Sequence, residues 1–311
     1  MAGFFSFSAA GLGLLFLATL ECLNASSAPP FLPRPLLLRL RFLCALLLSS
    51  FSLLSSLVSS LSSPAADPLG SSLPLSSLAA VAPFLLYSFA GFLSFPSSSL
   101  LVAPFPPSLL DLLLLFSFGQ EFLFFHLRCK DLDGVENRYF DLLLVPVLVC
   151  VVSTVLSIAR PRSPTPRIVR AAGLALHGTW FIQMGFSFFT SLIAHGCSVH
   201  ERSGTNYTIK CKTHEDYHRG RAIATLLFNC HLAFLVLAGT VFYRAVAEKT
   251  DNAPGYRPLS KEMQMADASP SNFTLDSDEE GEVAAEDRNG VEHHDDVVLP
   301  VADVENSNGT H

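Results

Sequence analysis

A run of 20 residues with a single charged side chain occupies positions 139–158 and reads YFDLLLVPVLVCVVSTVLSI. At about 1.5 Å per residue, a helix of this length spans roughly 30 Å, which matches the hydrocarbon core of a bilayer. Inside lipid the backbone polar groups must hydrogen-bond to one another, so an apolar run of this length is expected to be a helix. The stretch therefore predicts a transmembrane protein.

Six further apolar stretches of comparable length accompany this run. Half of the 311 residues are hydrophobic and 15% are charged, whereas soluble domains carry about a quarter charged residues. We expect an all-α fold, a polytopic transmembrane helical bundle of about seven spans that forms one domain, residues 1–250. The expected spans are 4–23, 35–61, 78–101, 108–127, 139–158, 170–194 and 222–246.

The first two stretches need separate comment. Ser26-Ser27-Ala28 resembles a signal-peptide cleavage site behind the first stretch, and cleavage there would leave six spans. Nine serines lie within residues 49–63, at the end of the second stretch. Because a serine hydroxyl can bond back to the preceding helical turn, we still expect this segment to insert as a helix.

Charge divides the chain into a body and a tail. Residues 251–311 hold 15 of the 27 acidic residues and 3 of the 20 basic ones, a local net charge of −12, and the rest of the chain carries +5. A segment that is acidic and poor in aromatic residues cannot bury enough surface to fold. We therefore expect a disordered tail with cytosolic protein partners. Neither part resembles a nucleic-acid-binding protein.

Loop charge favours an N-terminus outside the cytosol and a cytosolic C-terminus, in the plasma membrane or the endomembrane system. The basic residues on the side taken as cytosolic are Arg34, Arg39, Arg41, Arg160, Arg162, Arg167, Arg170, Arg244 and Lys249. A glycosylation sequon at Asn206 then lies outside, whereas sequons at Asn24, Asn272 and Asn308 argue for the reverse orientation.

Two of the seven cysteines, Cys197 and Cys211, bracket the loop that contains Asn206. In an oxidising compartment this pair can form a disulfide, and two free thiols are the alternative. The sequence has no CxxC pair, so a zinc ribbon or a thioredoxin-type motif is disfavoured.

Four polar residues fall within the outer halves of the expected spans: Glu121, Gln183, Asn229 and His231. An ionisable group within lipid costs about 2.5–3.5 kcal/mol on insertion scales, so each one needs a partner or a purpose. We hypothesise that the four side chains form a polar cluster that faces the bundle interior. The alternative is ordinary hydrogen bonding that holds helices together.

Two histidines of the polar outer loop, His214 and His218, stand four positions apart, which places both imidazoles on one helical face and suits a metal ion. A solvated histidine-rich loop is the alternative. The HExxH sequence of helical zinc enzymes is absent, and nothing marks out a catalytic residue. Zinc is therefore expected only if the protein is a metal-dependent hydrolase.

Several segments from Gly119 onward form a recognisable combination. They are GQEFLFFHL at 119–127, GVENRYFDLLLVP at 134–146, GTWFIQMGF at 178–186, AHGC at 194–197, HRGRA at 218–222 and FNCH at 228–231. Together they resemble plant members of the transmembrane protein 45 family (domain of unknown function 716), most strongly over residues 119–247. The resemblance implies a multi-pass membrane protein without an established biochemical activity, associated in plants with stress and virus responses.

The N-terminal third departs from this family. Members carry a Trp-His pair at the end of the first span and histidines near the third, whereas residues 18–24 here read ATLECLN and residues 75–78 read LSSL. A function that depends on those histidines therefore does not carry over to this chain.

Three functions compete on this sequence. The first is a non-enzymatic scaffold, adaptor or trafficking factor whose acidic tail binds cytosolic partners. The second is a transporter of protons or metal ions that uses Glu121, His177 and His231. The third is a zinc-dependent membrane hydrolase. We expect the first, because it needs no catalytic constellation.

Overall fold

The computed structural model describes residues 2–26, 33–61, 68–95, 105–128, 134–190, 196–203 and 206–251. Contacts divide the chain into two units, residues 1–254 and 255–311, and all described residues belong to the first. The acidic tail predicted for residues 251–311 lies, except for Asp251 at the end of the last helix, outside the described residues.

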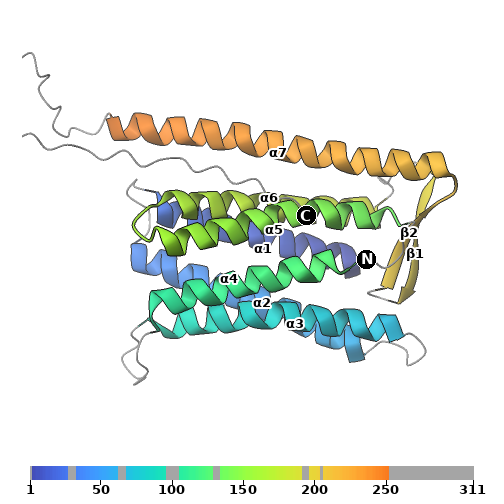
Figure 1. Ribbon diagram of the computed structural model, residues 1–311, viewed down its shortest axis with the longest axis horizontal. Helices are drawn as coiled ribbons and strands as arrows, with labels where there is room; N and C mark the ends of the chain where they lie inside the picture. The colour runs from blue at the N-terminus through green and yellow to red at the C-terminus, as the bar shows by residue number, and fades with distance from the viewer. Residues whose placement is uncertain are drawn as a thin grey trace, which may run out of the picture. The chain divides into compact units, whose positions relative to one another are not determined.

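The described residues form seven helices and one two-stranded sheet. They are α1 (Ala2–Ala25), α2 (Arg34–Leu61), α3 (Pro68–Leu93), α4 (Pro107–His126), α5 (Glu136–Ala159), α6 (Thr165–Phe189), β1 (Cys197–Ser203), β2 (Asn206–Cys211) and α7 (His214–Asp251). Successive helices run in alternating directions, so α1 begins and α7 ends at opposite ends of the bundle (Figure 1). The end that carries β1 and β2 is called the hairpin end here, and the other the far end.

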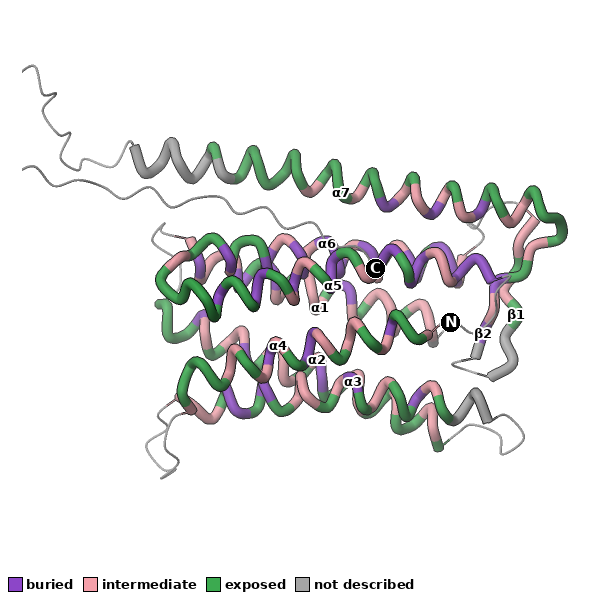
Figure 2. The backbone as a smooth tube through the Cα atoms, in the orientation of Figure 1, coloured by how far each residue is buried: buried purple, intermediate pink, exposed green. Residues whose placement is uncertain are grey.

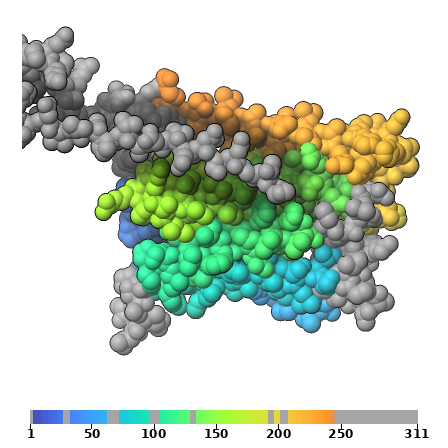
Figure 3. All heavy atoms as spheres, in the orientation of Figure 1, coloured from blue at the N-terminus to red at the C-terminus, as the bar shows by residue number. Residues whose placement is uncertain are grey.

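The predicted fold class, a transmembrane helical bundle, is confirmed. Six helices (all except α6) are long and apolar enough to cross a membrane. Large apolar side chains cover the outer surface of the bundle, among them Leu47, Phe51, Phe116, Leu148, Val152 and Phe234. Figure 3 shows one face of the molecule, on which α3 and α4 pack side by side. A surface of this kind suits lipid and not water.

The exception, α6, is also the most deeply buried helix. Packed against α1, α5 and α7, it accommodates Arg170, His177 and Ser187 in its buried positions. Figure 2 shows the buried residues concentrated along α5 and α6, with α7 largely exposed. Since protein surrounds α6 on several sides, its polar side chains have protein groups as neighbours where an outer helix would have lipid.

Close approach between α1 and α6 depends on two glycines. A Cβ atom at Gly11 would lie 2.6 Å from the carbonyl oxygen of Gly178, and one at Gly178 would lie 2.7 Å from the carbonyl oxygen of Gly11. Further along the crossing, a Cβ at Gly185 would lie 3.1 Å from the Cβ of Phe7. Small residues let helix backbones approach closely in membranes, so these positions hold the first and sixth helices together.

The predicted boundaries of the third span, 78–101, are wrong. Helix α3 begins ten residues earlier, at Pro68, and ends at Leu93, with Pro74 and Pro83 inside it. Proline is tolerated within membrane helices, because neighbouring helices and serine hydroxyls satisfy the freed backbone groups.

The last helix also begins earlier than the predicted residue 222. The amide of Asp216 donates to the hydroxyl oxygen of Thr213 at 3.1 Å, and that hydroxyl donates to the Asp216 carboxylate at 2.8 Å. A threonine hydroxyl that accepts from the amide of the third following residue is a typical N-cap, which starts a helix. The charged segment expected to be a loop thus forms the first two turns of α7.

Part of the same polar loop folds into an antiparallel hairpin. Cys197 and Cys211 face each other across β1 and β2 and are joined by a disulfide. Tyr207 and Ile209 are buried, whereas Lys210 between Ile209 and Cys211 is exposed. The hairpin is anchored to α5, because the Val135 amide donates to the Ile209 carbonyl and the Ile209 amide donates to the Glu136 carboxylate. The hairpin therefore covers one end of the bundle.

Candidate ligand-binding cavity

The interior of the bundle contains a cavity of about 520 Å³. It is bordered by side chains from α1 to α6 and by Tyr207 of β2, which closes the hairpin end. Pockets that hold small molecules measure roughly 300–1,000 Å³ and combine apolar walls with a few polar groups. Both the size and the lining of this cavity fall within that description.

One face of α1 follows the cavity along its length. Seven of its residues line the cavity, and all except Ser6 recur every three or four positions, as a single helical face requires: Gly3, Ser6, Phe7, Ala10, Leu14, Leu17 and Glu21. From Gly3 to Glu21 the helix rises roughly 27 Å at 1.5 Å per residue. The cavity is therefore elongated, with charged residues towards both ends: Glu21, Arg41 and Arg170 at the far end and Arg128 at the hairpin end.

The serines of α2 supply a polar stripe along the cavity. Ser49, Ser52, Ser56 and Ser59 line it, again at spacings of three and four. The hydroxyl oxygens of Ser56 and Ser77 on α3 lie 3.0 Å apart, and Ser49 also donates to the carbonyl oxygen of Ala45 at 2.7 Å. The serine-rich sequence of residues 49–63 thus directs part of its hydroxyl groups to the protein interior.

A charged cluster borders the cavity near the far end. The Glu21 carboxylate of α1 accepts a hydrogen bond from Arg41 Nη1 of α2 at 2.6 Å and one from Arg170 Nε of α6 at 3.1 Å. Arg170 Nη2 donates to the same carboxylate, and Arg41 Nη2 donates to the Tyr87 hydroxyl of α3. Side-chain exposure is 4% for Glu21 and 3% for Arg170. Four helices are therefore tied together by buried charge-assisted hydrogen bonds.

A second ionisable pair lies nearer the hairpin end, and its Glu121 lines the cavity. Glu121 of α4 lies 3.7 Å from Nε2 of His177 on α6. Neither ring nitrogen of His177 has a hydrogen-bond partner among the described residues, and the ring stacks on Phe181 at 4.9 Å. A carboxyl group and an imidazole at this separation can exchange a proton through one small movement or one water molecule.

The hairpin end of the cavity carries Arg128 and Tyr207. The Arg128 guanidinium lies 4.6 Å from the ring centroid of Phe140 and 5.4 Å from that of Phe124. Burial lowers the pKa of Arg128, and burial raises the pKa of Tyr207 to about 12. Tyr207 is thus neutral at physiological pH, and the aromatic rings compensate the buried arginine by cation–π contact.

The predicted cluster of Glu121, Gln183, Asn229 and His231 does not form. Asn229 is exposed on α7, and the Gln183 amide donates to the Ser187 hydroxyl on its own helix. His231 packs edge-on against Trp180, with the ring centroids 5.9 Å apart. The reason is helical phase: Ala224 and Phe228 of α7 are buried, and Asn229 lies about 100° away from Phe228.

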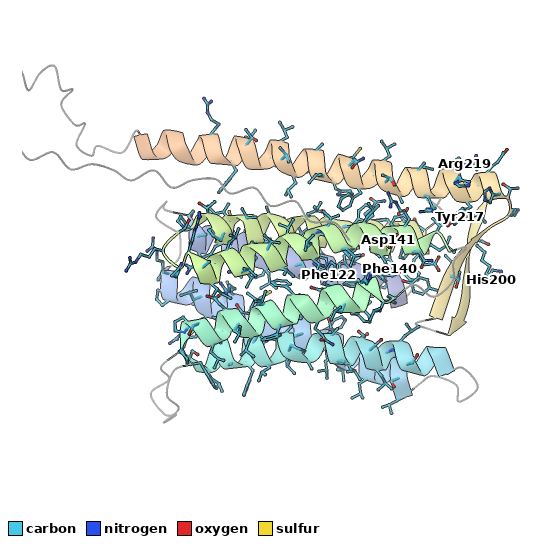
Figure 4. The ribbon with its side chains drawn as sticks, viewed as in Figure 1. Phe122, Phe140, Asp141, His200, Tyr217 and Arg219 are labelled. Atoms are coloured by element: carbon cyan, nitrogen blue, oxygen red, sulfur yellow. A yellow bond between two sulfur atoms is a disulfide. The ribbon has the colours of Figure 1, made fainter. Side chains whose placement is uncertain are left out.

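The imidazoles of His214 and His218 do lie together, with ring centroids 4.4 Å apart in the first turns of α7. In the part of the chain that the structure describes, no group of three histidine, cysteine or acidic residues could hold a metal ion. Figure 4 shows Tyr217 and Arg219 in the same turns, with His200 on the adjacent hairpin. The Asn206 side chain lies outside the described residues, so its glycosylation stays a prediction.

The charged cluster itself was missed by the sequence interpretation. Arg41 and Arg170 were counted there as residues of cytosolic loops, and Glu21 was not considered. One signal was present: three ionisable residues stand one to two turns inside the far ends of three spans. Ionisable groups at a shared depth are candidates for pairing, because each alone would be costly in lipid.

Comparison with known families bears on the second half of this site. Residues 107–244 match the model of a protein family of unknown function, DUF716. The match covers α4 to most of α7 and includes Glu121, Arg128, Arg170 and His177, whereas Glu21 and Arg41 lie outside it. None of the curated proteins matches the chain. The family and the helices together fit a membrane protein of unknown activity.

Proposed function

We propose that this protein is a non-enzymatic, multi-pass membrane protein that binds a small amphipathic molecule in the cavity between its helices. The cavity of about 520 Å³ is the observation that carries this proposal. A protein that acts only as a scaffold needs no internal space, and an unfilled cavity costs stability in proportion to its volume. Ligand binding gives the space a purpose.

The scaffold predicted from the sequence is compatible with this proposal as a role of the tail. Residues 251–311 carry the net charge of −12 and are the segment through which cytosolic partners would attach. The protein then has two separable activities. The helical bundle binds its ligand within the bilayer, and the tail binds partners in the cytosol.

Two finer assignments belong to the same proposal. The motifs between residues 119 and 247 favour a plant-type member of the transmembrane protein 45 group. The Cys197–Cys211 disulfide favours an oxidising compartment at the hairpin end, hence an outside N-terminus and a cytosolic end of α7. A glycan on Asn206 that a glycosidase removes would support this orientation, and an unglycosylated Asn206 would count against it.

Binding is tested by replacing Ala10, which lines the cavity midway along α1. Phenylalanine at this position projects into the space, so we expect Ala10→Phe to weaken binding of a single-chain lipid about tenfold or more. The measurement is photolabelling of the protein in nanodiscs by a photoreactive fatty acid and a photoreactive monoacylglycerol, mapped by mass spectrometry.

Ala9→Phe is the matched control. Ala9 precedes Ala10 on the same helix but is exposed on the outer surface, so the same enlargement leaves the cavity unchanged. We expect Ala9→Phe to be labelled as strongly as the unaltered protein. Equal labelling of the two variants, or labelling outside the cavity residues, would remove the basis of the proposed function.

A proton carrier is the second candidate, and the Glu121–His177 pair is the observation that favours it. If the pair relays protons, Glu121→Gln abolishes proton flux into liposomes, since glutamine cannot take up or release a proton. The isosteric amide leaves the size of the cavity nearly unchanged and lipid labelling intact. Flux that is absent from the unaltered protein would exclude this candidate and leave the binding proposal in place.

A further inference from the structure

One nitrogen of the buried Arg170 guanidinium is not used by the protein. Arg170 Nε and Nη2 both donate to Glu21, whereas Nη1 is buried and has no hydrogen-bond partner among the described residues. The side chain is 3% exposed and lines the cavity. A buried donor on a charged group without an acceptor is costly, so an acceptor from a ligand is expected at this position.

The charges around Arg170 indicate the charge of the ligand that would supply this acceptor. Among the described residues, Glu21 is the one carboxylate to which both Arg41 and Arg170 donate. Two groups act on this cluster electrostatically from nearby, Arg167 on Glu21 and Asp111 on Arg41. Three cations therefore stand against two anions, and in a membrane interior one uncompensated positive charge strongly favours an anion.

The remaining walls of the cavity indicate that the rest of the ligand is apolar. Apolar side chains continue from the cluster towards the hairpin end: Leu17, Leu14, Leu114, Phe118, Leu174 and Phe181. They border a space of about 520 Å³ that follows α1 for roughly 27 Å at 1.5 Å per residue, a length that suits an extended acyl chain. The serine stripe of α2 runs along one side of this space, and the other walls are mainly apolar. A mainly apolar passage with a cationic end matches an amphiphile.

From these observations we infer that the cavity binds a single-chain amphiphile with an anionic headgroup, held by Arg170 and Arg41 at the far end, with its chain directed towards the hairpin. This inference rests on the proposed function and specifies its ligand. A carboxylate or a phosphate fits, because both offer oxygens to the planar donors of a guanidinium.

Arg128, at the other end of the cavity, is a weaker site for an anion. Its guanidinium lies over the rings of Phe140 and Phe124, and the Glu136 carboxylate acts on it electrostatically. These contacts compensate part of its positive charge, although Arg128 Nε, like Arg170 Nη1, is buried without a hydrogen-bond partner among the described residues. Replacing each arginine separately therefore tests which of the two ends of the cavity holds the headgroup.

The first test uses the unaltered protein in nanodiscs and three photoreactive lipids with the same acyl chain. They carry a glycerol, a carboxylate or a glycerophosphate headgroup. We expect at least one anionic lipid to bind about tenfold or more tightly than the neutral one, the gain of one charge-assisted hydrogen bond. The tighter of the two anions identifies the headgroup. Equal binding of all three overturns the inference and leaves the proposed function, whereas absence of any binding overturns both.

The second test removes the arginine. In Arg170→Gln, Glu21 keeps Arg41 as its partner at 2.6 Å, so a compensated pair remains. We expect a loss of about tenfold in binding of the anionic lipid and little change in binding of the neutral one. Arg128→Gln is expected to preserve the preference for the anion. A folded Arg170→Gln protein with an unchanged preference overturns the inference; if the variant does not fold, the lipid series on the unaltered protein decides.

Discussion

Glu21→Gln is expected to destabilise the bundle by about 3–5 kcal/mol, the usual cost of breaking a buried ion pair from one side. The substitution preserves the shape of the side chain but leaves Arg41 and Arg170 buried without their shared carboxylate. In a domain of this size the loss corresponds to a fall of roughly 6–20 °C in the midpoint of thermal unfolding. Heating the protein in detergent and measuring the monodisperse fraction by size exclusion gives this midpoint.

Two further variants make that result specific. Glu215→Gln removes an exposed acid from the first turn of α7 and is expected to shift the midpoint little. The double variant Glu21→Gln/Arg170→Gln removes one of the uncompensated cations and should recover part of the lost stability. If the double variant is less stable by the full sum of the two single effects, the coupling described for these side chains is absent.

Gly178→Leu should separate α1 from α6 and lower stability by about 3 kcal/mol or more, at the upper end of the range for overpacked sites. The new Cβ would lie 2.7 Å from the carbonyl oxygen of Gly11, which is backbone and cannot rotate aside. The midpoint of thermal unfolding in detergent again reports the change. The Arg170–Glu21 contact, made across the same pair of helices, should weaken along with it.

Gly239→Leu on α7 is the matched control, since nothing lies within 4 Å of a Cβ built there. Glycine is less favourable than alanine in a helix by about 0.8–1.0 kcal/mol, and leucine ranks next after alanine, so this variant is expected to match or exceed the parent protein in stability. Equal destabilisation by the two leucines would mean that the α1–α6 crossing does not depend on Gly178.

The helices could be predicted because a lipid bilayer requires backbone polar groups to hydrogen-bond within the segment. Long apolar runs such as residues 139–158 have few other options in lipid, and their boundaries shifted mainly where a local feature intervened. The Thr213–Asp216 cap extended α7, and prolines permitted within α3 hid its true start. The hairpin was missed although Tyr207, Ile209 and Cys211 alternate with polar residues, which is typical of a strand.

The site could be predicted only in part. The sequence indicates how deep a residue lies in the membrane, but not towards which neighbouring helix its side chain points. The transporter interpretation grouped Glu121 with His177 and His231; in the structure Glu121 lies 3.7 Å from His177, whereas His231 packs against Trp180. The Glu21–Arg170 pair joins residues 149 positions apart, and no local pattern in the sequence relates them. Only the packing of α1 against α6 brings them together.

The polar composition of α6 has a consequence for how crossings are counted. A hydropathy profile that accepts only the six apolar helices gives an even number of membrane crossings. With an even number, both ends of the chain lie on the same side of the bilayer. We expect the buried helix α6 to cross as well, which would make the number of crossings odd and place the two ends of the bundle's chain on opposite sides of the bilayer. Fusion reporters placed along the chain should therefore change sides once between residues 160 and 200, within a segment that such a profile assigns to one compartment.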